Sequence, residues 1–282
     1  MNSKATERVY RARLLVVMIL LAGVAAGCAH QTPRLYAPMQ PDGWSAQPVS
    51  IACRFAPDAD LDPATGTPVG DEGYYLYILI DFAGNRDYSS TLSFVFSFEK
   101  NPGGHSWIIL ESPQDRLEFG HNGNLGLEKP LYQDGVYQGF RDNHPNPFAY
   151  LWEVMYDGRL EIGRPDRTPT FVWRMPITKR RYRLIYEYVM QRKYDQFSLR
   201  DNNCVDMVTN AAALAGINLI YRIRLTIPPE AKILGRKLRG WTDPKYHILE
   251  FSTPDVLQMD LRQLARFGIG SDVTEWYLGL KR

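Results

Sequence analysis

The residues with the clearest capacity for chemistry are a cysteine and a histidine about a hundred residues apart. Cys204 follows a pair of asparagines and comes directly before the apolar pattern of a predicted helix. A cysteine in the first turn of a helix meets unpaired N–H groups and the positive end of the helix dipole, which favour the thiolate. His105 follows a double glycine at the start of a predicted strand and is the best available imidazole to take the thiol proton. Cys204 is therefore the predicted nucleophile, and His105 is the predicted general base.

A catalytic imidazole also needs a polar neighbour that fixes its orientation and its tautomer. The segment Ser112-Pro113-Gln114-Asp115 predicts a turn between two strands, and folding the chain there brings residues 121 and 122 nearly opposite residue 105. We expect His121 to orient the imidazole, with Asn122 as the alternative.

The asparagines before the cysteine have two possible uses. Asn203, or the backbone N–H of Cys204, is placed to stabilise an oxyanion. Asn202 or Asn203 is equally suited to cap the helix that follows, because asparagine is a preferred N-cap residue. Both uses remain open at this point.

Together these residues resemble the circularly permuted papain-like superfamily, whose relatives include NlpC-type cell-wall peptidases and the lecithin:retinol acyltransferase group. The similarity rests on Gly-His-Ser-Trp-Ile at 104–108, Asn-Asn-Cys-Val-Asp at 202–206 and Ala-Gly-Ile at 215–217, and it covers about residues 100–218. The histidine precedes the cysteine, which is the permuted order. The resemblance implies an α+β fold with an antiparallel sheet packed against the cysteine-bearing helix. It also implies a cysteine hydrolase or acyltransferase that acts on amide or ester bonds and needs no cofactor.

The hydrophobic pattern predicts the elements that position these residues. Strands are expected at 49–55, 74–82, 91–99, 105–110, 116–121, 150–155, 159–162 and 170–175. Helices are expected near 179–193, with Thr178 as the N-cap, and near 254–267, with Thr253 as the N-cap. A third helix is expected to begin at 204 and to end at Gly216, a typical C-cap residue. Stretches dense in Gly, Asn, Asp and Pro predict surface loops at 57–73 and 122–147.

The N-terminal segment has the features of an export signal. Basic residues up to Arg13 precede an apolar run and then small residues that lead directly into Cys28. Ala25-Ala26-Gly27-Cys28 is similar to the lipobox of bacterial lipoproteins, which implies that residues 1–27 are a signal peptide and that Cys28 carries lipid, including a chain such as palmitate. The alternative is a plain signal peptide or a membrane anchor, although an apolar run of about fourteen residues is short for a span.

This interpretation predicts the organisation and the location of the chain. Residues 28–48 are expected to be a tether, and residues 49–282 a single α+β domain. Ala29 rather than Asp follows the lipidated position, which by the sorting rule of enteric lipoproteins implies the outer membrane, facing the periplasm. In this oxidising compartment Cys53 and Cys204 are the remaining cysteines, so a disulfide between them is an alternative to catalysis.

Composition excludes several classes of protein. The chain has 282 residues, of which 45% are apolar and 23% charged, values typical of a globular protein. Its net charge is +2, and residues 1–27 contribute four basic side chains and one acidic one, a net of +3, so the rest carries about −1. Nucleic acid is therefore not an expected partner.

The same sequence narrows the partners and functions that remain. The spacing of His105, His121 and His144 gives no positive sign of a metal site, and phosphate-binding loop motifs are absent. The expected partners are the membrane, through Cys28, and either peptidoglycan peptides or envelope lipid. The alternative function is a catalytically silent papain-like lipoprotein that serves as a binding or scaffolding module.

Overall fold

The computed structural model describes residues 34–35, 55–82, 104–123, 158–163, 167–198, 202–220, 223–226, 230–233, 236–239 and 248–280. Outside these residues lie the predicted signal peptide, Cys28, Cys53 and the predicted strands 91–99 and 150–155. Nearly all of the predicted loop 122–147 and all but Phe55 of the predicted strand 49–55 also lie outside them. The predicted tether is described only at residues 34–35, which form a short strand.

The fold is α+β, as predicted, and is built on a six-stranded antiparallel sheet with the strand order β11-β6-β2-β3-β4-β5. Its strands are β2 (Tyr75–Asp81), β3 (His105–Glu111), β4 (Arg116–Gly123), β5 (Gly158–Ile162), β6 (Phe171–Pro176) and β11 (Ser271–Asp272). The strands predicted at 74–82, 105–110, 116–121, 159–162 and 170–175 are confirmed to within two residues at each end.

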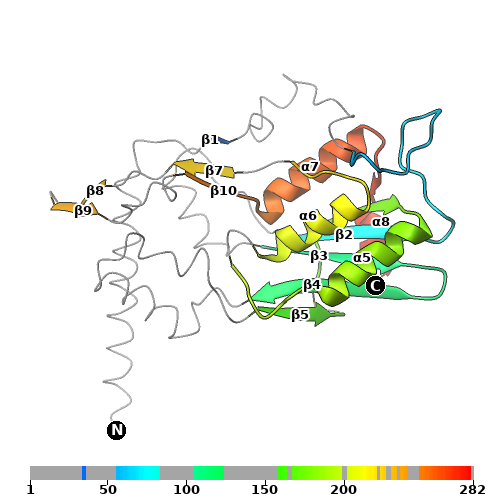
Figure 1. The fold of residues 1–282 in the computed structure, drawn as a ribbon, viewed down its shortest axis with the longest axis horizontal. Coiled ribbons are helices and arrows are strands. Elements are labelled where there is room, and N and C mark those ends of the chain that lie inside the picture. Colours follow the sequence, from blue (N-terminus) through cyan, green and yellow to red (C-terminus); the bar gives the residue numbers. More distant parts are fainter. Residues whose placement is uncertain are drawn as a thin grey trace, which may run out of the picture.

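Helices cover both faces of this sheet (Figure 1). The helices are α5 (Lys179–Gln191), α6 (Cys204–Leu214), α7 (Pro254–Arg266) and α8 (Thr274–Leu280). Apolar residues of α5, α6 and α7 share one core with Ile78, Ile108 and Phe119 of the sheet. A second, smaller core lies on the opposite face, where Tyr277 of α8 joins Tyr77 and Trp107.

Local sequence explains where the two central helices begin. The Thr178 hydroxyl accepts a hydrogen bond from the Arg181 N–H and caps α5. At the start of α6, the Asn203 side chain accepts from the backbone N–H groups of Val205 and Asp206, and the Asp206 carboxylate accepts from the Asn203 N–H. This reciprocal arrangement is a capping box, so the N-cap use of Asn203 is confirmed.

The C-terminal part contains elements that the sequence analysis did not predict. Two smaller sheets are formed by β1 (Arg34–Leu35), β7 (Ile223–Thr226) and β10 (Ile248–Phe251), and by β8 (Glu230–Ile233) and β9 (Arg236–Arg239). Helix α7 was predicted, but its expected cap is only positional, because Thr253 makes no side-chain capping hydrogen bond. Gly270, with a φ of 67°, then turns the chain toward β11 against the ring of Trp173.

The segment 55–74 is irregular, as its turn-rich sequence predicts. Arg181 of α5 binds this segment and also contacts the end of α6. The Arg181 side chain is 3% exposed. Its guanidinium donates to the Asp60 carboxylate at 3.1 Å and to the Leu214 carbonyl at 3.0 Å, and it also bonds to Asp58. A second anchor is the Asp71 carboxylate, which accepts from the Lys179 N–H at 2.7 Å at the start of α5.

Candidate functional site

The sheet separates the two residues that were predicted to react together. Along β3 successive side chains point to opposite faces, so His105 and Trp107 share one face while Ser106 and Ile108 share the other. Ile108 belongs to the same core as Cys204, whereas Trp107 belongs to the core on the α8 side. The predicted approach of His105 to the Cys204 thiol therefore does not occur in the structure.

Cys204 is a free, buried cysteine at the first position of α6. Burial raises the pKa of its thiol above the ordinary value of 9.0, and the carboxylate of Asp206 adds to the increase. The backbone and hydroxyl of Ser106, which lie beside the sulfur, act in the opposite direction without overcoming burial. The thiolate expected from the helix N-terminus is thus disfavoured, because desolvation against β3 outweighs the helix dipole. The thiol is also free of the disulfide that the sequence left open.

The imidazole on the same face as Cys204 is His121. Trp107 pairs with Gly120 across β3 and β4, so the register places His121 beside Ser106, the residue that lies next to the sulfur. The His121 ring is fully buried between Tyr194 and Phe197, with ring centroids 5.0 and 5.2 Å away. Neither ring nitrogen has a hydrogen-bond partner of ordinary geometry.

Its surroundings keep the His121 imidazole neutral. Burial, together with the positive charge of Arg192, lowers the pKa of His121 from 6.5 to about 4. Backbone groups of Tyr194, Asn203 and Gln196 lie beside the ring and oppose this decrease only in part. On this face, therefore, both the thiol and the imidazole rest in their uncharged forms.

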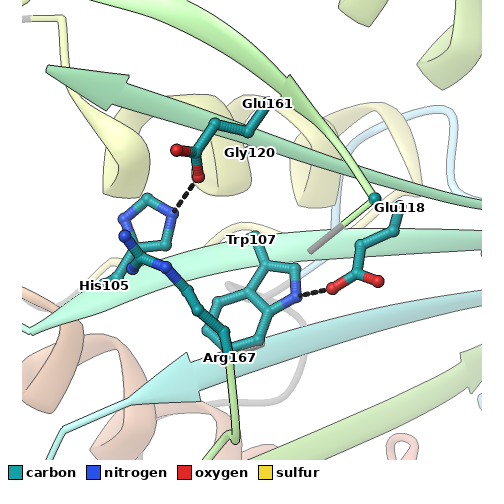
Figure 2. A pocket seen from close by; sticks show the side chains of 7 residues that line it. His105, Trp107, Glu118, Gly120, Glu161 and Arg167 are labelled. Carbon is teal, nitrogen blue, oxygen red and sulfur yellow. Dashed lines mark hydrogen bonds and ion pairs between the residues drawn. The ribbon is translucent and has the colours of Figure 1, made fainter. Parts of the chain in front are cut away.

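His105 faces a different set of polar residues, on the α8 side of the sheet (Figure 2). Its Nε2 lies 3.7 Å from Oε2 of Glu161, and the two side chains are only 8% and 7% exposed. The other oxygen of Glu161 accepts a hydrogen bond from Asn122 Nδ2 at 2.6 Å. A buried carboxylate that is itself held by an amide therefore lies next to the imidazole, at ion-pair distance and beyond hydrogen-bond distance. Asn122, the alternative orienting residue, donates to Glu161, and the register places His121 on the opposite face of the sheet from His105.

A small pocket of about 180 Å³, partly open to solvent, lies beside this pair. The Trp107 ring stacks on His105 at 5.7 Å, and its Nε1 donates to the Glu118 carboxylate at 2.5 Å. Gly120 forms part of the lining. A Cβ at this position would lie 3.2 Å from His105 Nε2 and 3.5 Å from Glu161 Oε2, so an alanine here would press on the imidazole and move it by a few tenths of an ångström.

Four residues that line this pocket were not predicted from the sequence: Glu161, Trp107, Glu118 and Arg167. Glu161 carried the strongest available signal, because it is a lone acid inside a short predicted strand next to the histidine hairpin. An isolated charge within a strand indicates either an exposed face or a buried partner. Only the pairing of β5 with β4, which puts Glu161 opposite Gly120, reveals that the partner is His105.

Comparisons of the chain with models of known protein families, with curated protein sequences and with solved structures each found no match. Within the described ranges, no group of three or more His, Cys, Asp or Glu side chains could hold a metal ion. No helix in the part of the chain that the structure describes is long and apolar enough to cross a membrane.

Proposed function

We propose that this chain is an envelope lipoprotein whose papain-like shell acts as a binding or scaffolding module without a poised nucleophile. The antiparallel sheet packed against the helix that begins at Cys204 supports the papain-like resemblance. The observation that carries the proposal is the separation of this pair by the sheet, which leaves Cys204 as a buried thiol with a raised pKa. A nucleophilic cysteine needs the opposite, an accessible thiolate near neutral pH.

Alkylation over a range of pH tests this proposal. The full chain is treated with iodoacetamide between pH 6 and 10, and peptide mass spectrometry assigns the label to Cys204. We expect the native thiol to react far more slowly at pH 7 than the same thiol in guanidinium chloride. We also expect the native rate to increase only above the ordinary thiol pKa. A native rate that is already half-maximal below pH 7 would contradict the proposal.

A turnover assay is the second test of this proposal. The chain and its Cys204→Ala variant are incubated with peptidoglycan sacculi and, separately, with phospholipid vesicles. We expect neither protein to release soluble fragments or fatty acid, and we expect no acyl adduct on Cys204 by intact mass. Release that disappears in the Cys204→Ala variant would contradict the proposal that the chain is a catalytically silent module.

A cysteine hydrolase or acyltransferase remains the second candidate, and one specific observation favours it. His121 lies on the same face as Cys204, next to Ser106, and neither of its nitrogens has a hydrogen-bond partner of ordinary geometry. A neutral imidazole near a neutral thiol is able to accept the thiol proton once a substrate is bound. This candidate requires that activity on the same substrates is lost in both Cys204→Ala and His121→Phe but is retained in His105→Phe. A catalytically silent module would show no such activity in any of these proteins.

A further inference from the structure

The hairpin formed by β8 and β9 concentrates positive charge. Residues 230–239 contain one acid and four basic residues, which are Glu230, Lys232, Arg236, Lys237 and Arg239, a net of +3. Residues 28–282 carry about −1 in total, so about −4 remains for them when this hairpin is set apart. The hairpin is therefore a strongly basic element in an otherwise acidic chain, and a separation of charge of this kind orients a protein toward an anionic partner.

The strand register divides this hairpin into two faces. Paired residues of antiparallel strands share a face, and successive pairs alternate between the two faces. The pairs of the first face are Glu230–Arg239 and Lys232–Lys237. The pairs of the second face are Ala231–Leu238 and Ile233–Arg236. The first face is therefore entirely charged, and the second is apolar except for one basic residue next to the turn.

The pair Lys232–Lys237 places two like charges at directly opposite positions. Such a pair destabilises a hairpin in water. In the described part of the chain, β8 and β9 pair only with each other, and a two-stranded hairpin of this kind is marginally stable by itself. An anionic partner both offsets the repulsion between the two lysines and stabilises the hairpin.

A lipid surface matches both faces of the hairpin better than an acidic polymer does. Anionic headgroups supply the negative charge, and the acyl boundary beneath them accepts apolar side chains. The face that carries Ala231, Ile233 and Leu238 has no counterpart on a nucleic-acid backbone or on a chain of carboxylates. Each basic residue close to an anionic membrane strengthens binding by roughly fivefold, so a net of +3 strengthens it by roughly a hundredfold.

Resting on the proposed envelope lipoprotein, we infer that the hairpin of β8 and β9 docks on the anionic phospholipid surface of the membrane that holds the chain. A tethered protein needs only a weak contact of this kind, because the anchor keeps the hairpin at a high effective concentration near the lipid. The contact fixes which side of the molecule faces the membrane.

Hydrogen exchange on the full chain tests this docking locally. The chain is reconstituted into vesicles of phosphatidylcholine alone or of phosphatidylcholine mixed with phosphatidylglycerol, and mass spectrometry follows the peptide that covers residues 230–239. We expect amide exchange in this peptide to be at least threefold slower in the anionic vesicles. High salt should remove the difference, because it screens the attraction. Residues 61–68, outside the hairpin, should exchange equally in both. Equal exchange of the hairpin in the two kinds of vesicle would overturn the inference.

A matched pair of double substitutions separates the hairpin from the overall charge of the chain. Lys232→Gln combined with Lys237→Gln removes two charges and also relieves the repulsion between the opposed positions, so it does not weaken the pairing of the strands. We expect the protection by anionic vesicles to be lost. Lys179→Gln combined with Lys193→Gln removes the same charge at exposed positions and should leave the protection within twofold. Loss in both double variants, or in neither, would contradict docking by the hairpin.

The same measurement tests other partners of a basic hairpin. Duplex DNA or polyglutamate is added to the chain in phosphatidylcholine vesicles, and the exchange of residues 230–239 is followed again. We expect less protection than in the anionic vesicles. Equal or stronger protection would assign the hairpin to an acidic polymer. Protection that follows the ratio of protein to lipid, and not the content of phosphatidylglycerol, would assign it to a second copy of the chain. Either result would overturn the inference.

The outcomes separate this inference from the proposed function. If anionic vesicles do not protect the hairpin, docking on lipid is wrong, while the alkylation of Cys204 still decides whether the chain is a catalytically silent module. If the alkylation reveals a thiolate but the hairpin is protected as described, the silent module is wrong and the docking remains.

Discussion

The neutral ring of His121 makes the stability of this protein depend on pH. The imidazole is fully buried between two aromatic rings and is held away from its charged form. In the unfolded chain the same ring takes up a proton near pH 6.5, whereas in the folded chain it does so only near pH 4. Above pH 6.5 the ring is neutral in both states and the depressed pKa does not affect stability, whereas between pH 6.5 and 4 the unfolded chain binds the proton more readily and the fold is progressively destabilised.

The expected size of this effect follows from the shift. The difference between 6.5 and about 4 corresponds to about 3 kcal/mol of unfolding free energy, lost over that interval. In His121→Phe this component should be absent, because phenylalanine does not titrate. Urea unfolding at half-unit steps from pH 7 to pH 4 measures both slopes. Parallel profiles for the two proteins would show that His121 does not titrate in this way.

At the scale of elements, one buried guanidinium joins the segment 55–74 to two helices. Arg181 contacts Asp60, Asp58 and the Leu214 carbonyl at the end of α6. The guanidinium is removed from water, so its hydrogen-bond partners would lose a charged donor if the side chain were replaced. Breaking a buried pair leaves a charge or a carbonyl without compensation, which costs more than breaking an exposed pair.

A matched pair of substitutions tests this difference at one shared partner. Arg181→Met should lower the free energy of unfolding by about 3 kcal/mol. Arg180 also contacts Asp60, at 3.3 Å, but its side chain is 52% exposed, so Arg180→Met should cost less than about 1 kcal/mol. Chemical denaturation of the two variants measures both values. Similar losses for both would mean that the buried position of Arg181 confers no extra stability.

The elements also show which parts of the fold and the site the sequence could predict. Helices α5 and α6 were predicted because Thr178 and Asn203 are recognisable caps before clear apolar patterns. The face of His105 was not predictable in the same way. Strand β3 is buried on both faces, so its sequence lacks the alternation of apolar and polar residues that tells inside from outside.

The pairing partners of β3 then decide which residues form a site. The hairpin predicted that residues near 121 and 122 lie beside His105, and the register confirms Asn122 on its face. Glu161 comes from a strand that is joined to this hairpin only in three dimensions. Long-range pairing of this kind is not encoded locally in the chain, which is why the contact between Glu161 and His105 was missed.

At the scale of the whole molecule, the C-terminal residues close the second face of the sheet. Tyr277 of α8 is 3% exposed and packs with Tyr77 and Trp107, which are also buried. No element was predicted after residue 267, yet β11 adds to the sheet edge and α8 covers the smaller core. The terminal helix is therefore an integral part of the fold.

Substitution on either side of α8 tests its docking. Tyr277→Ala removes a buried ring and should lower the free energy of unfolding by about 3 kcal/mol. Leu280 is on the same helix but 58% exposed, so Leu280→Ala should change it by less than about 0.5 kcal/mol. Thermal or urea unfolding compares the two. A small effect of Tyr277→Ala would show that α8 is not firmly docked.

The anchoring of residues 55–74 has a consequence for how the molecule opens. Phe55 bridges to Ile217, Asp60 is held by Arg181, and Asp71 receives the first N–H of α5, so the segment is tied down at its beginning, middle and end. A stretch rich in proline and glycine would ordinarily be the first site of proteolytic cleavage. Here we expect cleavage at the exposed residues 63–66 to be independent of the helices, whereas cleavage next to Asp60 requires the contact with Arg181 to open.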